Sequence, residues 1–156
     1  MSITHLKIGD TAPNFEGIDQ DNQPIKLKDF QGKKVILFFY PKDNTPTCTV
    51  EACNFRDNQE MLTKEGYVTI GVSPDGSKSH IKFRTKHNLP FPLIADTDKS
   101  ILNLYGVWGE KKFMGRIYDG VHRTTFVIDE NGIISQVIKK VKSKIHTQQI
   151  LDLEAV

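Results

Sequence analysis

Two nearly continuous apolar runs are the clearest pattern in the chain: KVILFFY at residues 34–40 and YVTIGVS at residues 67–73. Runs of this length that are rich in β-branched and aromatic residues are typical of strands covered on both faces. Residues 46–64, between the two runs, carry apolar residues at helical spacing, and Gly66 is placed to end that helix. The pattern therefore predicts a sheet with helices above and below it.

The remaining segments continue the alternation of helices and strands. We expect a basic helix at residues 77–88, a strand at 91–95, a helix from 98 to 106, a loop up to 123 and a final helix at 145–155. Hairpins are expected at Asp21-Asn22 and at Asn131-Gly132, where a two-residue turn needs positive φ at both central positions. Residues 1–156 are thus predicted to form a single α/β domain, whose central mixed sheet is flanked by helices, with an N-terminal β-hairpin.

Composition and charge exclude several classes of function. The chain is 38% apolar and 26% charged, as is usual for a folded globular protein. Its 21 basic and 19 acidic residues leave a net charge of +2, which gives no reason to expect nucleic acid or an anionic membrane as partner. No apolar run approaches the roughly 20 residues of a membrane span. The start, MSITHLKIGD, has no signal-peptide pattern, so we expect a cytoplasmic protein.

The two cysteines of the chain, Cys48 and Cys53, lie five positions apart near the start of the predicted helix 46–64. They are open to three interpretations: a structural disulfide, a pair of inert core cysteines, or a redox couple. A reducing compartment disfavours a permanent disulfide. The cysteines and the scattered histidines show no zinc-site spacing, and no nucleotide-binding glycine loop is present, so no metal or cofactor is expected.

The predicted position of Cys48 favours reactivity. Pro46 suits the first helical position, which makes Thr45 the N-cap and places Cys48 in the first turn. There the exposed N–H groups and the positive end of the helix dipole favour a thiolate. Cys48 also shares a face with Ala52 and Phe55, so we expect it to form the floor of a pocket.

The spacing of the two cysteines predicts motion if they bond. On an ideal helix, residues five apart differ by about 140° in direction and by about 8.7 Å between their Cα atoms. A disulfide needs Cα atoms closer than roughly 7 Å. Cys48 and Cys53 can therefore bond only if the first turns of the helix unwind, which suits a transient disulfide better than a structural one.

Three sequence motifs resemble those of the peroxiredoxins. Pro41-x-x-x-Thr45-x-x-Cys48 is similar to their peroxidatic-cysteine motif, and CTVEACNFRD from Cys48 resembles the branch called bacterioferritin comigratory protein, or peroxiredoxin Q. The likeness runs from IGDTAPNF at the N-terminus through YGVWGEKKFMG to RTTFVID, which begins at Arg123. It implies a thioredoxin-like fold and a thiol-specific peroxidase that reduces hydrogen peroxide and organic hydroperoxides to water and alcohols.

The resemblance also implies roles for individual residues. Cys48 would be the peroxidatic thiol, Thr45 would offer its hydroxyl to the thiolate and the peroxide, and Pro41 would shield the sulfur from water. Arg123 would hold the thiolate and the charge that develops on the departing oxygen, where a fixed cation lowers the barrier. Glu51 either pairs with Arg123 or favours the first turn of the helix, and both interpretations are open.

Cys53 would be the resolving thiol. It would attack the Cys48 sulfenic acid and form an intramolecular disulfide, which thioredoxin, or in some members glutaredoxin, would reduce. No second cysteine occurs late in the chain, so a dimer-bridging disulfide is excluded and a monomer is expected. Thr47 stands where this branch usually has glycine, and its β-branched side chain puts the rate of unwinding in doubt.

Two other functions remain as alternatives. A redox sensor or holdase would use the same pair, Cys48 and Cys53, without high turnover. A dithiol oxidoreductase that acts on protein disulfides is disfavoured because the CxxC spacing is missing. Of the other features, His80 and His87 are expected to be solvated, and the lysine-rich residues 139–144 are expected to form an exposed edge strand protected by charge.

Overall fold

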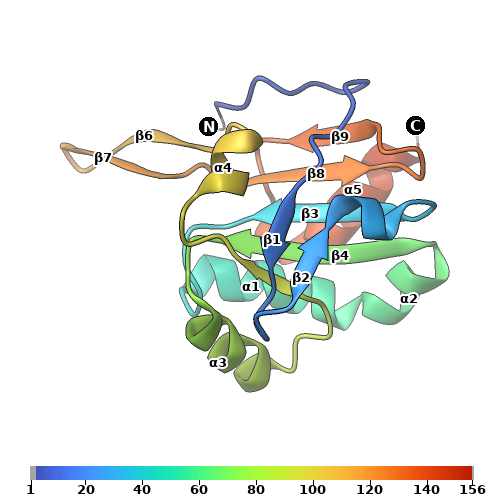
Figure 1. Cartoon of the computed structure of the whole chain (residues 1–156), viewed down its shortest axis with the longest axis horizontal. Helices are drawn as coiled ribbons and strands as arrows, with labels where there is room; N and C mark the ends of the chain where they lie inside the picture. The colour runs from blue at the N-terminus through green and yellow to red at the C-terminus, as the bar shows by residue number, and fades with distance from the viewer. Residues whose placement is uncertain (1–2, 156) are drawn as a thin grey trace.

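The structure is a computed structural model that describes residues 3–155. Its centre is a five-stranded mixed sheet in the order β5-β4-β3-β8-β9 (Figure 1). β3 and β4 are parallel, β4 and β5 are parallel, and β8 runs antiparallel to both β3 and β9. The bounds of these strands are Lys34–Phe39 for β3, Tyr67–Ser73 for β4, Leu93–Ala95 for β5, Thr124–Ile128 for β8 and Ile134–Ile138 for β9.

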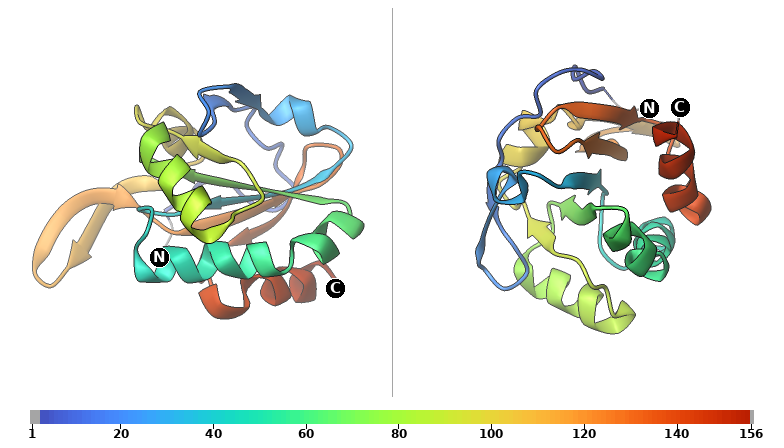
Figure 2. Two further views of the ribbon diagram at one scale, coloured as in Figure 1. Left: turned by 90° about the horizontal axis from the view of Figure 1, so that it is seen from below. Right: turned by 90° about the vertical axis from the view of Figure 1, so that its right-hand side faces the viewer.

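Helices and two small hairpins surround this sheet (Figure 2). The helices are α1 (Pro46–Asp57), α2 (Gln59–Lys64), α3 (Ser77–His87), α4 (Ser100–Leu104) and α5 (His146–Glu154), with 3-10 turns η1 (Leu27–Phe30) and η2 (Ser143–Ile145). The hairpins are β1–β2 (Glu16–Ile18, Pro24–Lys26) and β6–β7 (Trp108–Phe113, Arg116–Val121). The predicted mixed sheet with flanking helices and the N-terminal hairpin are thus confirmed. None of the helices described is long and apolar enough to cross a membrane.

The central strand β3 supplies both halves of the core, because alternate residues of a strand point to opposite faces. Val35, Leu37 and Phe39 pack with the β1–β2 hairpin and α4. Ile36 and Phe38 pack on the other face with α1, α2, α3 and α5. The nearly continuous apolar run in the sequence follows directly from burial on both sides.

Three local predictions need correction. The predicted helix 46–64 is divided at Asn58, which caps α1 with φ −109° and separates it from α2. The predicted loop before residue 123 contains the β6–β7 hairpin, which extends away from the body of the molecule (Figure 1). The lysine-rich residues 139–144 do not form a strand, since β9 ends at Ile138 and the chain bends into η2.

The β8–β9 hairpin is confirmed, but its turn is longer than predicted. The chain turns over Asp129–Gly132, where the Gly132 N–H donates to the Asp129 carbonyl at 3.0 Å. Of the two central residues expected to have positive φ, only Gly132 does, at 79°. The Asp129 carboxylate accepts from the Asn131 and Ile133 amides and thereby closes the longer loop.

Candidate active site

Cys48 lies at the N-terminus of α1, in the loop-to-helix connection that follows the central strand. Thr45 occupies the N-cap position with extended backbone angles, and Pro46 is the first helical residue. Cys48 is 1% exposed and lies on the buried face of α1 with Ala52 and Phe55. The structure agrees with the predicted N-cap at Thr45 and with the predicted buried orientation of Cys48.

Sheet pairing brings Arg123 to Cys48 across 75 residues of sequence. Thr124 pairs with Phe39, so the start of β8 lies beside the end of β3 and the loop that leads to α1. Arg123 Nη2 donates to Cys48 Sγ at 3.0 Å, and Nη1 donates to Glu51 Oε1 at 2.6 Å. A guanidinium at hydrogen-bond distance stabilises negative charge on the sulfur, because charge-assisted hydrogen bonds are the strong ones.

Glu51 carries a fully buried carboxylate that contacts the guanidinium of Arg123. Burial raises the pKa of Glu51 to about 7, although Arg123 acts in the opposite direction. Burial also acts to lower the pKa of Arg123, but Glu51 and Cys48 together raise it above its usual value. Of the two interpretations left open for Glu51, the structure shows the ion pair with Arg123.

His146 lies behind Glu51, a neighbour that no sequence signal identified. Its ring is fully buried, with Nε2 3.6 Å from Glu51 Oε2 and 2.8 Å from the Thr125 hydroxyl. Nδ1 faces the Gln149 carbonyl oxygen at 2.8 Å, so Nδ1 carries the proton and Nε2 accepts one from Thr125. Burial lowers the pKa of His146 to about 4, which keeps the ring neutral near pH 7.

The other predicted site residues lie in α1 or in the loop before it. The Thr45 hydroxyl donates to the Lys42 carbonyl at 2.8 Å. A hydroxyl has one proton to donate. Thr45 can therefore donate to Cys48, as predicted, only after its hydroxyl breaks the bond to the Lys42 carbonyl. Pro41 is half-buried in the same loop, and Cys53 is a half-buried free thiol farther along the intact helix α1.

A second buried network fixes the loop before α1 and corrects the prediction for His80. Asp43 accepts from the Tyr40 hydroxyl at 2.6 Å and lies 2.7 Å from His80 Nδ1. His80 Nε2 faces the Ile94 carbonyl at 2.9 Å, so the ring is buried and bonded on both sides, not solvated. Among the described residues, Asp43, Asp75 and His80 are the group whose ligand atoms lie within 4.8 Å of one another, but these atoms already serve this network.

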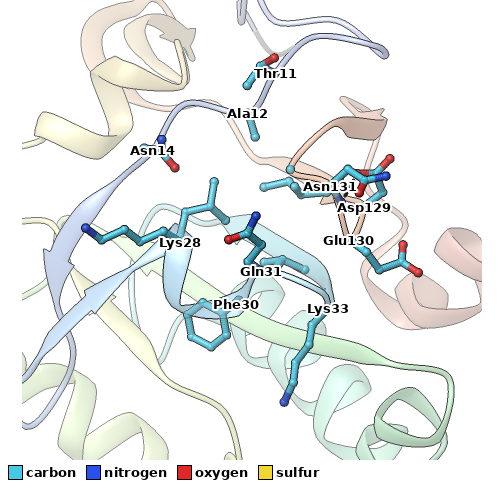
Figure 3. Close-up of a pocket in the computed structure, with 14 residues that line it drawn as sticks. Thr11, Ala12, Asn14, Lys28, Phe30, Gln31, Lys33, Asp129, Glu130 and Asn131 are labelled. Carbon is cyan, nitrogen blue, oxygen red and sulfur yellow. Dashed lines mark hydrogen bonds between the residues drawn. The ribbon is translucent and has the colours of Figure 1, made fainter.

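A cavity of about 250 Å³ lies at the other end of the sheet from Cys48 (Figure 3). Val35 at the start of β3 and Ile128 at the end of β8 contribute to its lining, whereas the site described above lies at the opposite ends of these two strands. The cavity therefore takes no part in the chemistry of Cys48.

Comparisons with known proteins identify the family of the chain. The model of the AhpC/TSA family matches residues 8–137. The peroxiredoxin Bcp of Escherichia coli K12 is 45% identical over 147 residues, which cover 94% of each chain. The chain is a peroxiredoxin of the AhpC/TSA family. Solved structures agree: a variant of Xylella fastidiosa PrxQ superposes with a TM-score of 0.89 at 31% identity, and covers 97% of this chain and 98% of its own.

The peroxiredoxin fold and the Bcp/PrxQ branch predicted from the motifs are confirmed by these relatives. The bacterioferritin comigratory protein of Xanthomonas campestris, described with its alkyl peroxide reduction activity, is also similar, with a TM-score of 0.86, 30% identity, and coverage of 97% of this chain and 98% of that one. The chain is thus a peroxidase, and the residues around Cys48 are its candidate active site.

The raised pKa of the buried Glu51 predicts a pH dependence of peroxide reduction. As the pH falls through about 7, Glu51 takes up a proton and the charge that orients Arg123 is lost. We expect the rate of peroxide reduction to decrease in that range, and we expect a Glu51→Gln variant to lack this inflection because an amide does not titrate there. Stopped-flow measurements of the rate of peroxide reduction between pH 5.5 and 8.5 test this expectation for both proteins. An unchanged inflection in the variant would assign the titration to a group other than Glu51.

Proposed function

We propose that Cys48 is the peroxidatic thiol of this enzyme and that it reduces hydrogen peroxide and organic hydroperoxides. The observation that carries the proposal is the 3.0 Å contact between Arg123 and the buried sulfur at the start of α1. The thiolate attacks the terminal peroxide oxygen in line, and an S–O bond forms while the O–O bond breaks. The leaving alkoxide or hydroxide takes a proton from water, which gives an alcohol or water and a Cys48 sulfenic acid.

The residues around Cys48 support this step by placing charge and excluding water. Negative charge moves from sulfur to the departing oxygen, and Arg123 lies where it can follow that movement. Glu51 holds the guanidinium in place from the side away from the substrate. Thr45 supplies a hydroxyl proton once it turns from Lys42 toward the bound peroxide, and Pro41 covers the sulfur from solvent.

Cys53 completes the cycle as the resolving thiol in this proposal. It attacks the Cys48 sulfenic acid, an S–S bond forms, and water leaves. Both cysteines lie on α1 of the same chain, so the disulfide needs no second subunit and the enzyme works as a monomer. The dithiol of thioredoxin, or of glutaredoxin, then reduces the disulfide and is itself oxidised.

Removal of Cys53 tests this cycle. With thioredoxin, its reductase and NADPH, the unmodified enzyme is expected to consume peroxide through many turnovers. Cys53→Ser is expected to retain one rapid oxidation of Cys48 but to lose most of the recycling by thioredoxin, because the sulfenic acid has no partner. Mass spectrometry of the variant after one equivalent of peroxide should find Cys48 as sulfenic acid.

Two outcomes would contradict the proposed cycle. The absence of sulfenic acid in Cys53→Ser would refute the assignment of the two cysteines. Stoichiometric oxidation of the unmodified protein without turnover would favour a peroxide sensor or holdase that uses the same pair.

A further inference from the structure

Asn54 joins α1 to the segment that leads into α5. Its Nδ2 donates to the Lys144 carbonyl at 3.0 Å, and its Oδ1 accepts from the Thr147 N–H at 2.8 Å. Both ends of one side-chain amide are therefore bonded to the backbone of η2 and α5, 90 and 93 residues away. Figure 2 shows α1 and α5 on the same side of the sheet, where these bonds join them.

Arg56, at the C-terminal end of α1, donates to the His87 carbonyl at 2.8 Å and lies beyond the segment that has to unwind. Ahead of it, two polar tethers hold the first turns of α1 in place, and they differ in their response to oxidation. The first is Arg123, which bonds to Cys48 and Glu51. When Cys48 becomes a neutral sulfenic acid, Arg123 loses an anionic partner, and this tether weakens. The second is Asn54, whose partners are backbone groups that oxidation does not change. After the peroxide step, Asn54 is the one of these two tethers that remains at full strength.

The position of Asn54 makes its release relevant to the second step. It directly follows Cys53, which points about 140° away from Cys48 on an intact helix. Cys53 cannot turn about the helix axis while the next side chain is bonded at both ends. The following residue, Phe55, stays anchored by ring contacts with Phe38 and His146 at centroid distances of 4.9 and 5.2 Å. Unwinding that moves Cys53 therefore has to break or distort the two hydrogen bonds of Asn54.

We propose that Asn54 is a positioning residue that keeps α1 closed and thereby sets the rate of the disulfide step. The inference rests on the proposed role of Cys53 as the resolving thiol. Asn54 touches neither the peroxide nor the sulfur, so it leaves the first step unchanged. It decides how long the sulfenic acid persists, and hence how often a second peroxide converts it to sulfinic acid before Cys53 arrives.

Hydrogen exchange of Asn54→Ala tests the tether itself. We expect the amides of α1 to exchange about tenfold faster than in the unmodified protein, because one hydrogen bond to η2 and one to α5 are lost. Asn103→Ala is the matched control: its amide donates to the carbonyl of Lys99, the N-cap of α4, away from the site, and its loss should leave exchange in α1 unchanged. Unchanged exchange in Asn54→Ala would overturn the proposal, whatever the role of Cys53.

Rapid-quench kinetics test the consequence for the reaction. In Asn54→Ala, the oxidation of Cys48 should keep its rate, and the conversion of sulfenic acid to disulfide should become about tenfold faster. The peroxide concentration that half-converts Cys48 to sulfinic acid should increase by a similar factor. Faster exchange without a faster disulfide step would overturn the claim that Asn54 sets that rate. A lack of any Cys48–Cys53 disulfide in the unmodified enzyme would instead refute the proposed function, while exchange would still test the tether.

Discussion

Replacement of Cys48 by serine is expected to abolish peroxide reduction, with kcat/KM at least about 1,000-fold lower in the thioredoxin-coupled assay. Serine is close to cysteine in size, so the buried position at the start of α1 and the contact with Arg123 should be kept. The serine hydroxyl stays protonated near neutral pH, however, and cannot act as the anionic nucleophile that cleaves the O–O bond.

Cys53→Ser is the matched control for this experiment, because it removes the other thiol of the same helix. One equivalent of peroxide should oxidise Cys53→Ser rapidly and leave Cys48→Ser unmodified. If Cys48→Ser kept turnover within tenfold of the unmodified enzyme, the nucleophile would have to be another group. Circular dichroism checks that both variants keep the native fold.

Arg123→Met is expected to slow the oxidation of Cys48 by about 100- to 1,000-fold. Methionine has a similar reach but supplies no charge and no N–H donor, so both the thiolate and the departing oxygen lose their cation. Arg123→Lys keeps the charge, but an ammonium group cannot reproduce the planar fork that bonds Cys48 and Glu51 together. The oxidation rate of Arg123→Lys should lie between that of Arg123→Met and that of the unmodified enzyme, as measured by stopped-flow at pH 8.

A stability effect has to be separated from this catalytic one. Without Arg123, the buried Glu51 carboxylate lacks its cation, and its pKa, already raised by burial, increases further. A carboxyl group with a raised pKa in the folded state favours folding at low pH and loses that contribution as the pH rises. Arg123→Met should therefore have a smaller free energy of unfolding at high pH than at low pH. The double variant Arg123→Met, Glu51→Gln should recover this stability but not the rate of Cys48 oxidation. Recovery of the rate would show that Arg123 acts only through the fold.

The candidate site could be predicted from the sequence because its parts lie in local motifs. Pro46 and Thr45 define the helix start, and the motif around Cys48 predicts which residue is the nucleophile. The pairing of Glu51 with Arg123 does not follow from the sequence, because nothing local shows that β8 lies beside β3. The two residues meet because Thr124 of β8 pairs with Phe39 of β3 in the folded sheet.

The buried histidines could not be predicted for a related reason. His80 lies in a helix whose neighbouring positions are basic, and helical spacing alone suggested solvent. Its burial depends on Asp43, a loop residue 37 positions earlier. His146 is buried because η2 turns α5 back onto α1, a tertiary contact without a local signal.

The β6–β7 hairpin was missed because its strands bury little. Most of its residues are exposed, including Phe113, Met114 and Ile117, so the alternation of apolar and polar residues that reveals a half-buried strand is absent. Its turn is marked by positive φ at Met114 and Gly115, and methionine gives no turn signal. The break between α1 and α2 at Asn58 is similarly weak in the sequence.

The partnership of Cys48 with a strand 75 residues downstream has a consequence for biosynthesis. While the ribosome is still adding the segment that contains β8, the nascent chain already carries Cys48 but has no Arg123 beside it. The thiol acquires its cation only when the late strand docks against β3. The activation proposed for this thiol can therefore arise only in chains long enough to include β8, and only after β8 has paired with β3.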